Sequence, residues 1–82
     1  MTELEFPQEC QFRIIAEDLD NMHFVIETVL MELGVTAPLR RANTSAGGKY
    51  VSYSVTTIVD SRDAMNRIDH ELRQVAGVRM VL

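Results

Sequence analysis

The stretch SAGGKYVSYSVTTIV, residues 45–59, places two glycines and a lysine directly before a run of Val, Thr, Ser and Tyr residues. β-Branched and aromatic residues favour extended backbone, so residues 50–59 predict the clearest strand of the chain. Side chains alternate along a strand, so Tyr53 and Val55 should share one side, and Tyr50, Ser52 and Ser54 the other. The glycines permit positive φ in a hairpin loop that precedes this strand.

Alternation, helical periodicity and end signals predict the remaining elements. In chain order these are a strand at residues 11–17, a helix from Leu19 to Gly34, an edge strand at residues 38–43, a helix from a cap at Asp60 or Ser61 to Gly77, and a strand at residues 78–82. In the last strand, Val78, Met80 and Leu82 should face the core and Arg79 should face away.

The element order is therefore β-α-β-β-α-β. Two helices with one apolar stripe each can both cover one face of a four-stranded antiparallel sheet. Right-handed crossovers then give the strand order 4-1-3-2. The sequence predicts an α+β, ferredoxin-like two-layer sandwich, and a length of 82 residues predicts a single domain over residues 1–82.

Several segments resemble the YbeD family: the run at residues 45–50, the alternating Ser52, Ser54 and Thr56, the ending VRMVL at residues 78–82, and Phe6-Pro7 before a strand. The resemblance extends from Phe6 to Leu82. The family's loop pattern Pro-Ser-Ser-Lys-Gly is replaced here by TSAGG at residues 44–48, and the lysine is displaced to Lys49.

This resemblance implies a bacterial protein with a fold like that of the regulatory ACT domains. It implies a small regulatory or ligand-binding module rather than an enzyme. The family carries a provisional label of lipoic-acid-binding regulatory proteins, so lipoate or another small acidic ligand is the expected ligand class.

Composition indicates which disulfides, metal sites and cellular location to expect. Cys10 is the single cysteine, so the chain can form no internal disulfide and no Cys-based metal site of its own. We expect no metal and no cofactor. No apolar run approaches the roughly 20 residues of a membrane helix, and acids stand near the N-terminus where a signal peptide has cations. The expected location is the cytoplasm.

More specific functions find little support in the sequence. A phosphate-binding loop needs a hydroxyl after its lysine and a helix beyond it, whereas Lys49 is followed by Tyr50 and a strand. Lipoyl carriers are all-β, so covalent lipoylation of Lys49 is disfavoured. His23 and His70 are expected to be solvated side chains. A net charge of −4 disfavours nucleic acid, although RNA-binding domains use this fold and Tyr50 could stack a base.

The uncovered face of the sheet is the main candidate site. It should carry Arg13, Tyr50, Ser52, Ser54 and Arg79, with the two arginines on neighbouring strands. Two adjacent cations favour an acid between them, either a small carboxylate or the acidic side chain of a partner protein. The alternatives are a protein-interaction subunit that uses this face or a helix, and a face that is simply half-solvated.

A second candidate surface lies on the first helix. Phe24 and Met31 fall outside its apolar stripe and are seven residues apart, with Glu27 nearby. An exposed aromatic beside a methionine suits contact with another protein or with a second copy in a homodimer. The alternative is that the arm at residues 4–7 folds over this pair.

Overall fold

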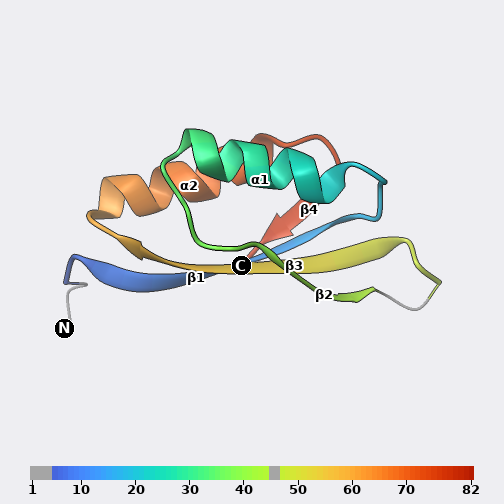
Figure 1. Cartoon of the computed structure of the whole chain (residues 1–82), viewed down its shortest axis with the longest axis horizontal. Helices are drawn as coiled ribbons and strands as arrows, with labels where there is room; N and C mark the ends of the chain where they lie inside the picture. Colours follow the sequence, from blue (N-terminus) through green and yellow to red (C-terminus); the bar gives the residue numbers. More distant parts are fainter. Residues whose placement is uncertain (1–4, 45–46) are drawn as a thin grey trace.

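The computed structural model describes residues 5–44 and 47–82 and has the predicted β-α-β-β-α-β order. The elements are β1 (Gln8–Glu17), α1 (Met22–Glu32), β2 (Arg40–Thr44), β3 (Tyr50–Val59), α2 (Arg62–Gln74) and β4 (Val78–Val81). The four strands form one antiparallel sheet in the order β2-β3-β1-β4, and both helices lie on one face of it (Figure 1). The predicted ferredoxin-like sandwich is confirmed.

The centre of the sheet is a long ladder between β1 and β3. Their register is continuous from Gln8 opposite Val59 to Glu17 opposite Tyr50. β1 therefore begins three residues before the predicted start at Gln11. The residues involved, Gln8 to Cys10, have no strong strand propensity, so their extended form follows from pairing with the β-branched end of β3.

The core lies between the sheet and the helices. On the covered face β1 contributes Phe12, Ile14 and Ala16, and β3 contributes Val51, Tyr53, Val55 and Val59. The helices add Met22, Ile26, Leu30, Ile68 and Leu72, and the remaining core residues are Val35, Leu39 and Val81. The predicted inward faces of β1 and β3 are confirmed.

The two helices differ in how closely their ends match the prediction. In α2 the side chain of Ser61 accepts a hydrogen bond from the backbone N–H of Ala64 at 3.1 Å, so Ser61 is the predicted N-cap. The start of α1 lies at Met22 rather than at the predicted Leu19, because Leu19 sits in a turn whose carbonyl accepts the N–H of Met22. Leu19 is consequently exposed and outside the core. The second helix ends at Gln74 rather than at the predicted Gly77, because Val75 is already extended, and Gly77, with φ of +94°, lies in the turn that leads to β4.

The predicted orientation of β4 is wrong for two residues. Met80 and Leu82 are 48% and 64% exposed, and Val81 is the buried residue. The cause is a register shift, because Met80 pairs with Ile15 and Val78 pairs with Ala16, which leaves Arg79 as an extra residue. Such a β-bulge reverses the alternation that follows it. Met80 and Leu82 therefore join the uncovered side of the sheet.

Candidate binding face

The open face is the side of the sheet that the helices leave uncovered (Figure 1). Cross-strand register places on it Arg13 and Ile15 of β1, Arg40 of β2, Ser52, Ser54, Thr56, Ile58 and Tyr50 of β3, Met80 of β4, Leu82 beyond β4, and the polar Glu9, Gln11 and Glu17. The predicted site residues on β1 and β3 thus share one surface.

Two arginines flank the centre of this face. Ser54 of β3 lies opposite Arg13 of β1 on one side and opposite Arg40 of β2 on the other. With neighbouring strands about 4.8 Å apart, the two arginine backbones lie roughly 10 Å apart. Neither arginine forms an ion pair with any residue in the ranges 5–44 and 47–82. This pair of cations can therefore receive carboxylates from outside the molecule.

Arg79 does not join that pair. Its guanidinium donates to Glu17 Oε1 at 3.1 Å, so its charge is already balanced within the chain. The backbone of Arg13 pairs with Leu82, three residues beyond Arg79. The predicted juxtaposition of Arg13 and Arg79 is wrong, because the bulge and the offset of β4 bring Leu82 opposite Arg13 instead. Arg40 is the partner arginine that the sequence reading missed.

Apolar side chains border the arginines. Ile15, Met80 and Leu82 gather where β1 meets β4, and Ile58 is exposed near the end of β3. Tyr50 lies at the opposite end of β3 from Ile58, across from Glu17. The open face thus combines two unpaired cations and several hydroxyls with exposed apolar side chains. Such a mixture is typical of a surface that binds a partner.

The hydroxyls on this face are not arranged as a catalytic group. Ser52 and Ser54 are half-buried and have no hydrogen bond to a histidine or carboxylate in the described part of the chain. An activated nucleophile needs such a base within hydrogen-bond reach. Within the same residues, no group of three or more His, Cys, Asp or Glu side chains could hold a metal ion.

The second predicted surface lies on α1. Phe24 and Met31 are 71% and 73% exposed, as the helical wheel predicted. Of the arm that could have covered them, Leu4 lies outside the described residues, and residues 5–7 leave the pair exposed. Glu27 between them makes a 3.5 Å contact with His23. This surface joins two exposed apolar side chains to one exposed carboxylate.

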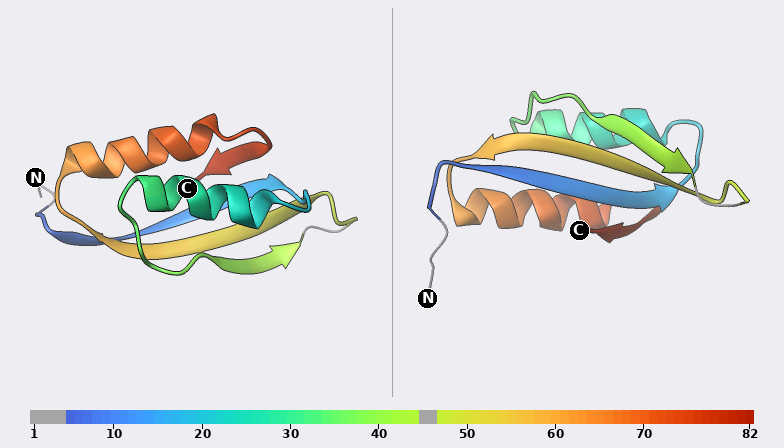
Figure 2. Two further views of the ribbon diagram at one scale, coloured as in Figure 1. Left: turned by 45° about the horizontal axis from the view of Figure 1, so that its top comes forward. Right: turned by 90° about the horizontal axis from the view of Figure 1, so that it is seen from below.

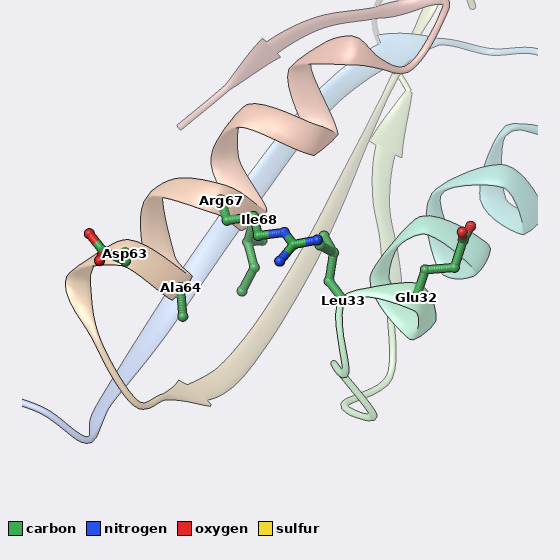
Figure 3. A pocket seen from close by; sticks show the side chains of 6 residues that line it. All are labelled: Glu32, Leu33, Asp63, Ala64, Arg67 and Ile68. Atoms are coloured by element: carbon green, nitrogen blue, oxygen red, sulfur yellow. The ribbon is translucent and has the colours of Figure 1, made fainter.

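A groove between the helices is a third feature (Figure 3). It has a volume of about 370 Å³ and is lined by Glu32, Leu33, Asp63, Ala64, Arg67 and Ile68. Arg67 reaches from α2 across the groove toward Leu33. Because two carboxylates line the same groove as this cation, it has weaker selectivity for an anion than the open face.

His23 has a structural environment. Its side chain is 41% exposed and so partly solvated, and its ring meets the ring of Tyr53 edge-on at 5.4 Å. Burial raises the pKa of Tyr53, Arg41 partly offsets this, and Asp18 adds to it. Arg41 and Asp18 are themselves joined by an ion pair of 3.1 Å. The Arg41–Asp18 pair thus lies at the surface, whereas Tyr53 belongs to the core.

Gly47 and Gly48 lie in the connection between β2 and β3. Gly47 and Gly48 have φ of +89° and +69°, which confirms the turn function predicted for them, while Ser45 and Ala46 lie outside the described residues. The carbonyl of Lys49 accepts the N–H of Asp18 at 3.0 Å, and the lysine is exposed. In the ranges described, no helix is both long and apolar enough to cross a membrane.

Comparisons with known proteins agree with this architecture. The family described as "Protein of unknown function (DUF493)" matches residues 1–82. A UPF0250 protein of Shewanella frigidimarina is 25% identical over 79 residues, which cover 96% of this chain and 90% of that protein.

Solved structures show the same fold. Protein HP0495 of H. pylori has a TM-score of 0.84 and 22% identity over 100% of this chain and 88% of that one. The ACT domain of the GTP pyrophosphokinase of Chlorobium tepidum has a TM-score of 0.66 and 21% identity over 90% of this chain and 94% of that domain.

Proposed function

This chain belongs to the DUF493 family, the YbeD-like family of proteins of unknown function, and we propose that it is a non-catalytic regulatory module that binds an acidic partner protein through its open face. The single observation that carries the proposal is the pair Arg13 and Arg40. They flank Ser54 on an uncovered sheet and form no ion pair with any described residue.

The shape of the open face supports a protein partner. Sites for small ligands are usually concave, whereas the hollows of about 440, 390 and 370 Å³ at the sheet edges and between the helices are not lined by Arg13, Arg40 or Ser54. A partner surface that carries two carboxylates could engage both arginines. Its apolar side chains would then rest on Met80 and Leu82.

A small acid with an apolar chain, such as lipoate, is the second candidate ligand. Arg13 lies opposite Leu82 and two residues from Ile15, so one cation has apolar neighbours on the same face. A carboxylate could pair with Arg13 while its chain covers Ile15 and Leu82. This ligand would use only half of the arginine pair.

The test is a titration with two probes followed by amide chemical shifts. We expect the acidic peptide heptaglutamate to shift the amides around Ser54 and Ile15, and lipoate to bind more weakly. The double change Arg13→Gln with Arg40→Gln should reduce peptide affinity by about tenfold or more, which corresponds to about 1.4 kcal/mol. The melting temperature should stay unchanged, since both side chains are exposed.

Two control variants make the test specific. Arg67→Gln removes one positive charge from the helix side, as Arg13→Gln or Arg40→Gln alone does from the open face, and Phe24→Ser with Met31→Ser removes the α1 surface. Both should keep the affinity of the parent. If Arg67→Gln weakens binding as much as the double change, the effect is general charge, and the open face is not the site. If only the α1 variant loses binding, the partner uses α1 instead.

A further inference from the structure

The edge of the sheet beside β1 is only partly covered. β4 pairs with β1 up to Ile14, and Leu82 adds one more pair with Arg13. From Gln8 to Phe12, β1 has β3 on one side and no strand of the described chain on the other. Figure 2 shows the same arrangement, with the short β4 lying beside only one end of β1.

The phase of the ladder determines which backbone groups face this edge. In an antiparallel pair, the N–H and C=O of one residue point to the same side, and successive residues point to opposite sides. Arg13 uses both groups toward Leu82, at 3.1 and 2.8 Å, and the N–H of Glu17 bonds to Gly77 at 2.9 Å. By the same phase, the N–H and C=O of Glu9 and Gln11 face the edge. They have no backbone partner in residues 5–44 and 47–82.

Helix α2 lies over this edge on the covered side of the sheet. Seen from below the sheet, α2 extends beyond β1 on the side away from β3 (Figure 2). The space between them is a hollow of about 440 Å³, lined by residues 8–12, Met65, Asn66, Asp69 and Leu82. The sulfurs of Cys10 and Met65 lie 3.8 Å apart at its wall, and Gln8 Oε1 is buried there without a hydrogen-bond partner among the described residues.

We propose that this edge receives an extended segment of another protein, which adds to the sheet as a strand beneath α2. The segment runs in the direction of β4, because that ladder is already antiparallel to β1. Its backbone pairs with Glu9 and Gln11. Its alternate side chains fill the hollow against Cys10 and Met65, so these positions are apolar.

Charge defines the other face of the segment. The side chains of Glu9 and Gln11 lie on the open face of the sheet, and Asp69 of α2 lines the hollow on the covered side. Asp69 is already paired with Arg73 at 2.8 Å, whereas Glu9 forms no ion pair with a described residue. Side chains of the added strand that lie opposite Glu9 and Gln11 are therefore basic. The recognised segment alternates apolar and basic residues.

A second copy of this chain does not fit the edge. Antiparallel pairing of two β1 strands around Cys10 would place a two-fold axis at the hollow. Because α2 overhangs this edge, the axis would bring a second α2 into the same space. A single extended segment needs only the width of one strand, about 4.8 Å.

The experiment uses the peptide acetyl-Lys-Val-Lys-Val-Lys-Val-Lys-amide with the whole protein. We expect amide exchange at Glu9 and Gln11 to slow by about tenfold once the peptide exceeds its Kd by about tenfold. Methylation of the backbone nitrogens of the lysine residues should abolish binding, because those N–H groups face β1. N-methylation of the valines, whose N–H groups point away, should leave it intact. Gln11→Pro should also abolish binding, since it removes an N–H that β3 does not use, and Gln11→Ala should not.

Each other outcome contradicts the proposal. No binding at about 1 mM peptide would overturn it, as would equal binding of the two methylated peptides. Protection of Glu9 and Gln11 that rises with protein concentration alone would show that a second copy occupies the edge. The methylated peptides act on the parent protein, so they decide the matter even if Gln11→Pro fails to fold. Unchanged binding to a folded Gln11→Pro variant would place the peptide elsewhere on the molecule and overturn the proposal.

Discussion

On β3, the covered face carries Val51, Tyr53, Val55 and Val59, whereas the open face carries Tyr50, Ser52, Ser54, Thr56 and Ile58. The two sets come from the same ten residues and differ by one step along the strand. Burial makes the covered face intolerant of polarity, because a buried polar group without a partner costs free energy. The open face has no such constraint, so its residues are free to serve binding. Stability therefore depends on the covered face, and the proposed recognition depends on the open face.

The largest effect should come from a charge on the covered side. Leu72 is completely buried in α2, where it meets the sheet. Leu72→Asp would bury an unpaired carboxylate at a cost of several kcal/mol, which is comparable to the total stability of a small domain. We expect loss of the folded circular dichroism spectrum. His70→Ala, on the exposed side of the same helix, should shift the unfolding free energy by less than about 0.5 kcal/mol. Equal melting temperatures for both variants would refute the assignment of helix faces.

The next effect compares two glycines of positive φ. A Cβ on Gly77, at φ of +94°, would lie 2.6 Å from Cε of the core residue Met22. A Cβ on Gly48, at φ of +69°, would meet nothing within 4 Å. Gly77→Ala should cost about 2–4 kcal/mol from backbone strain plus core crowding. Gly48→Ala should cost only the strain, about 1 kcal/mol. Urea denaturation measures both, and a larger loss for Gly48→Ala would contradict the packing around Gly77.

A pair of adjacent residues tests the two faces most directly. Val55→Thr places a hydroxyl on the covered face and should cost about 1–3 kcal/mol. Thr56→Val makes the reverse change on the exposed face and should stay within about 0.5 kcal/mol. Both variants conserve shape closely, so volume plays little part. If the two changes have equal cost in denaturant titrations, the distinction between the faces fails.

The parts of the fold that burial determines could be predicted from the sequence. Fold, strand order and the covered faces of β1 and β3 follow from alternation and from apolar stripes on the helices, because burial enforces those patterns. The orientation of Met80 and Leu82 did not follow, because a bulge at Arg79 adds one residue without any mark in the local sequence.

The candidate site was predicted only in part. Arg13, Ser52 and Ser54 lie on the open face as strand alternation required. Arg40 was missed because its place beside Ser54 depends on the pairing of β2 with β3, and a short polar strand carries no signal of register. Charge balance also depends on tertiary contacts, since Arg79 meets Glu17, 62 residues away in sequence.

The smallest expected effect is a dependence on alkaline pH that belongs to the covered face alone. Burial raises the pKa of Tyr53 above its ordinary value near 10, with Arg41 opposing and Asp18 reinforcing the shift. The folded state therefore holds the phenolic proton more tightly than the unfolded state does. Its contribution to stability is complete below pH 10 and is lost as the pH rises from there through the pKa of the folded state.

Tyr53→Phe removes the ionising group and should remove this loss. We expect the melting temperature of the variant to fall less steeply than that of the parent between about pH 9 and 11. The measurement is the difference between the two melting curves across that range, in which the titration of all other groups cancels. Parallel declines would mean that the Tyr53 phenol ionises equally well in the folded and unfolded chains. In that case Tyr53 would belong to a solvated surface, and the division between a structural face and a recognition face would not hold at this end of β3.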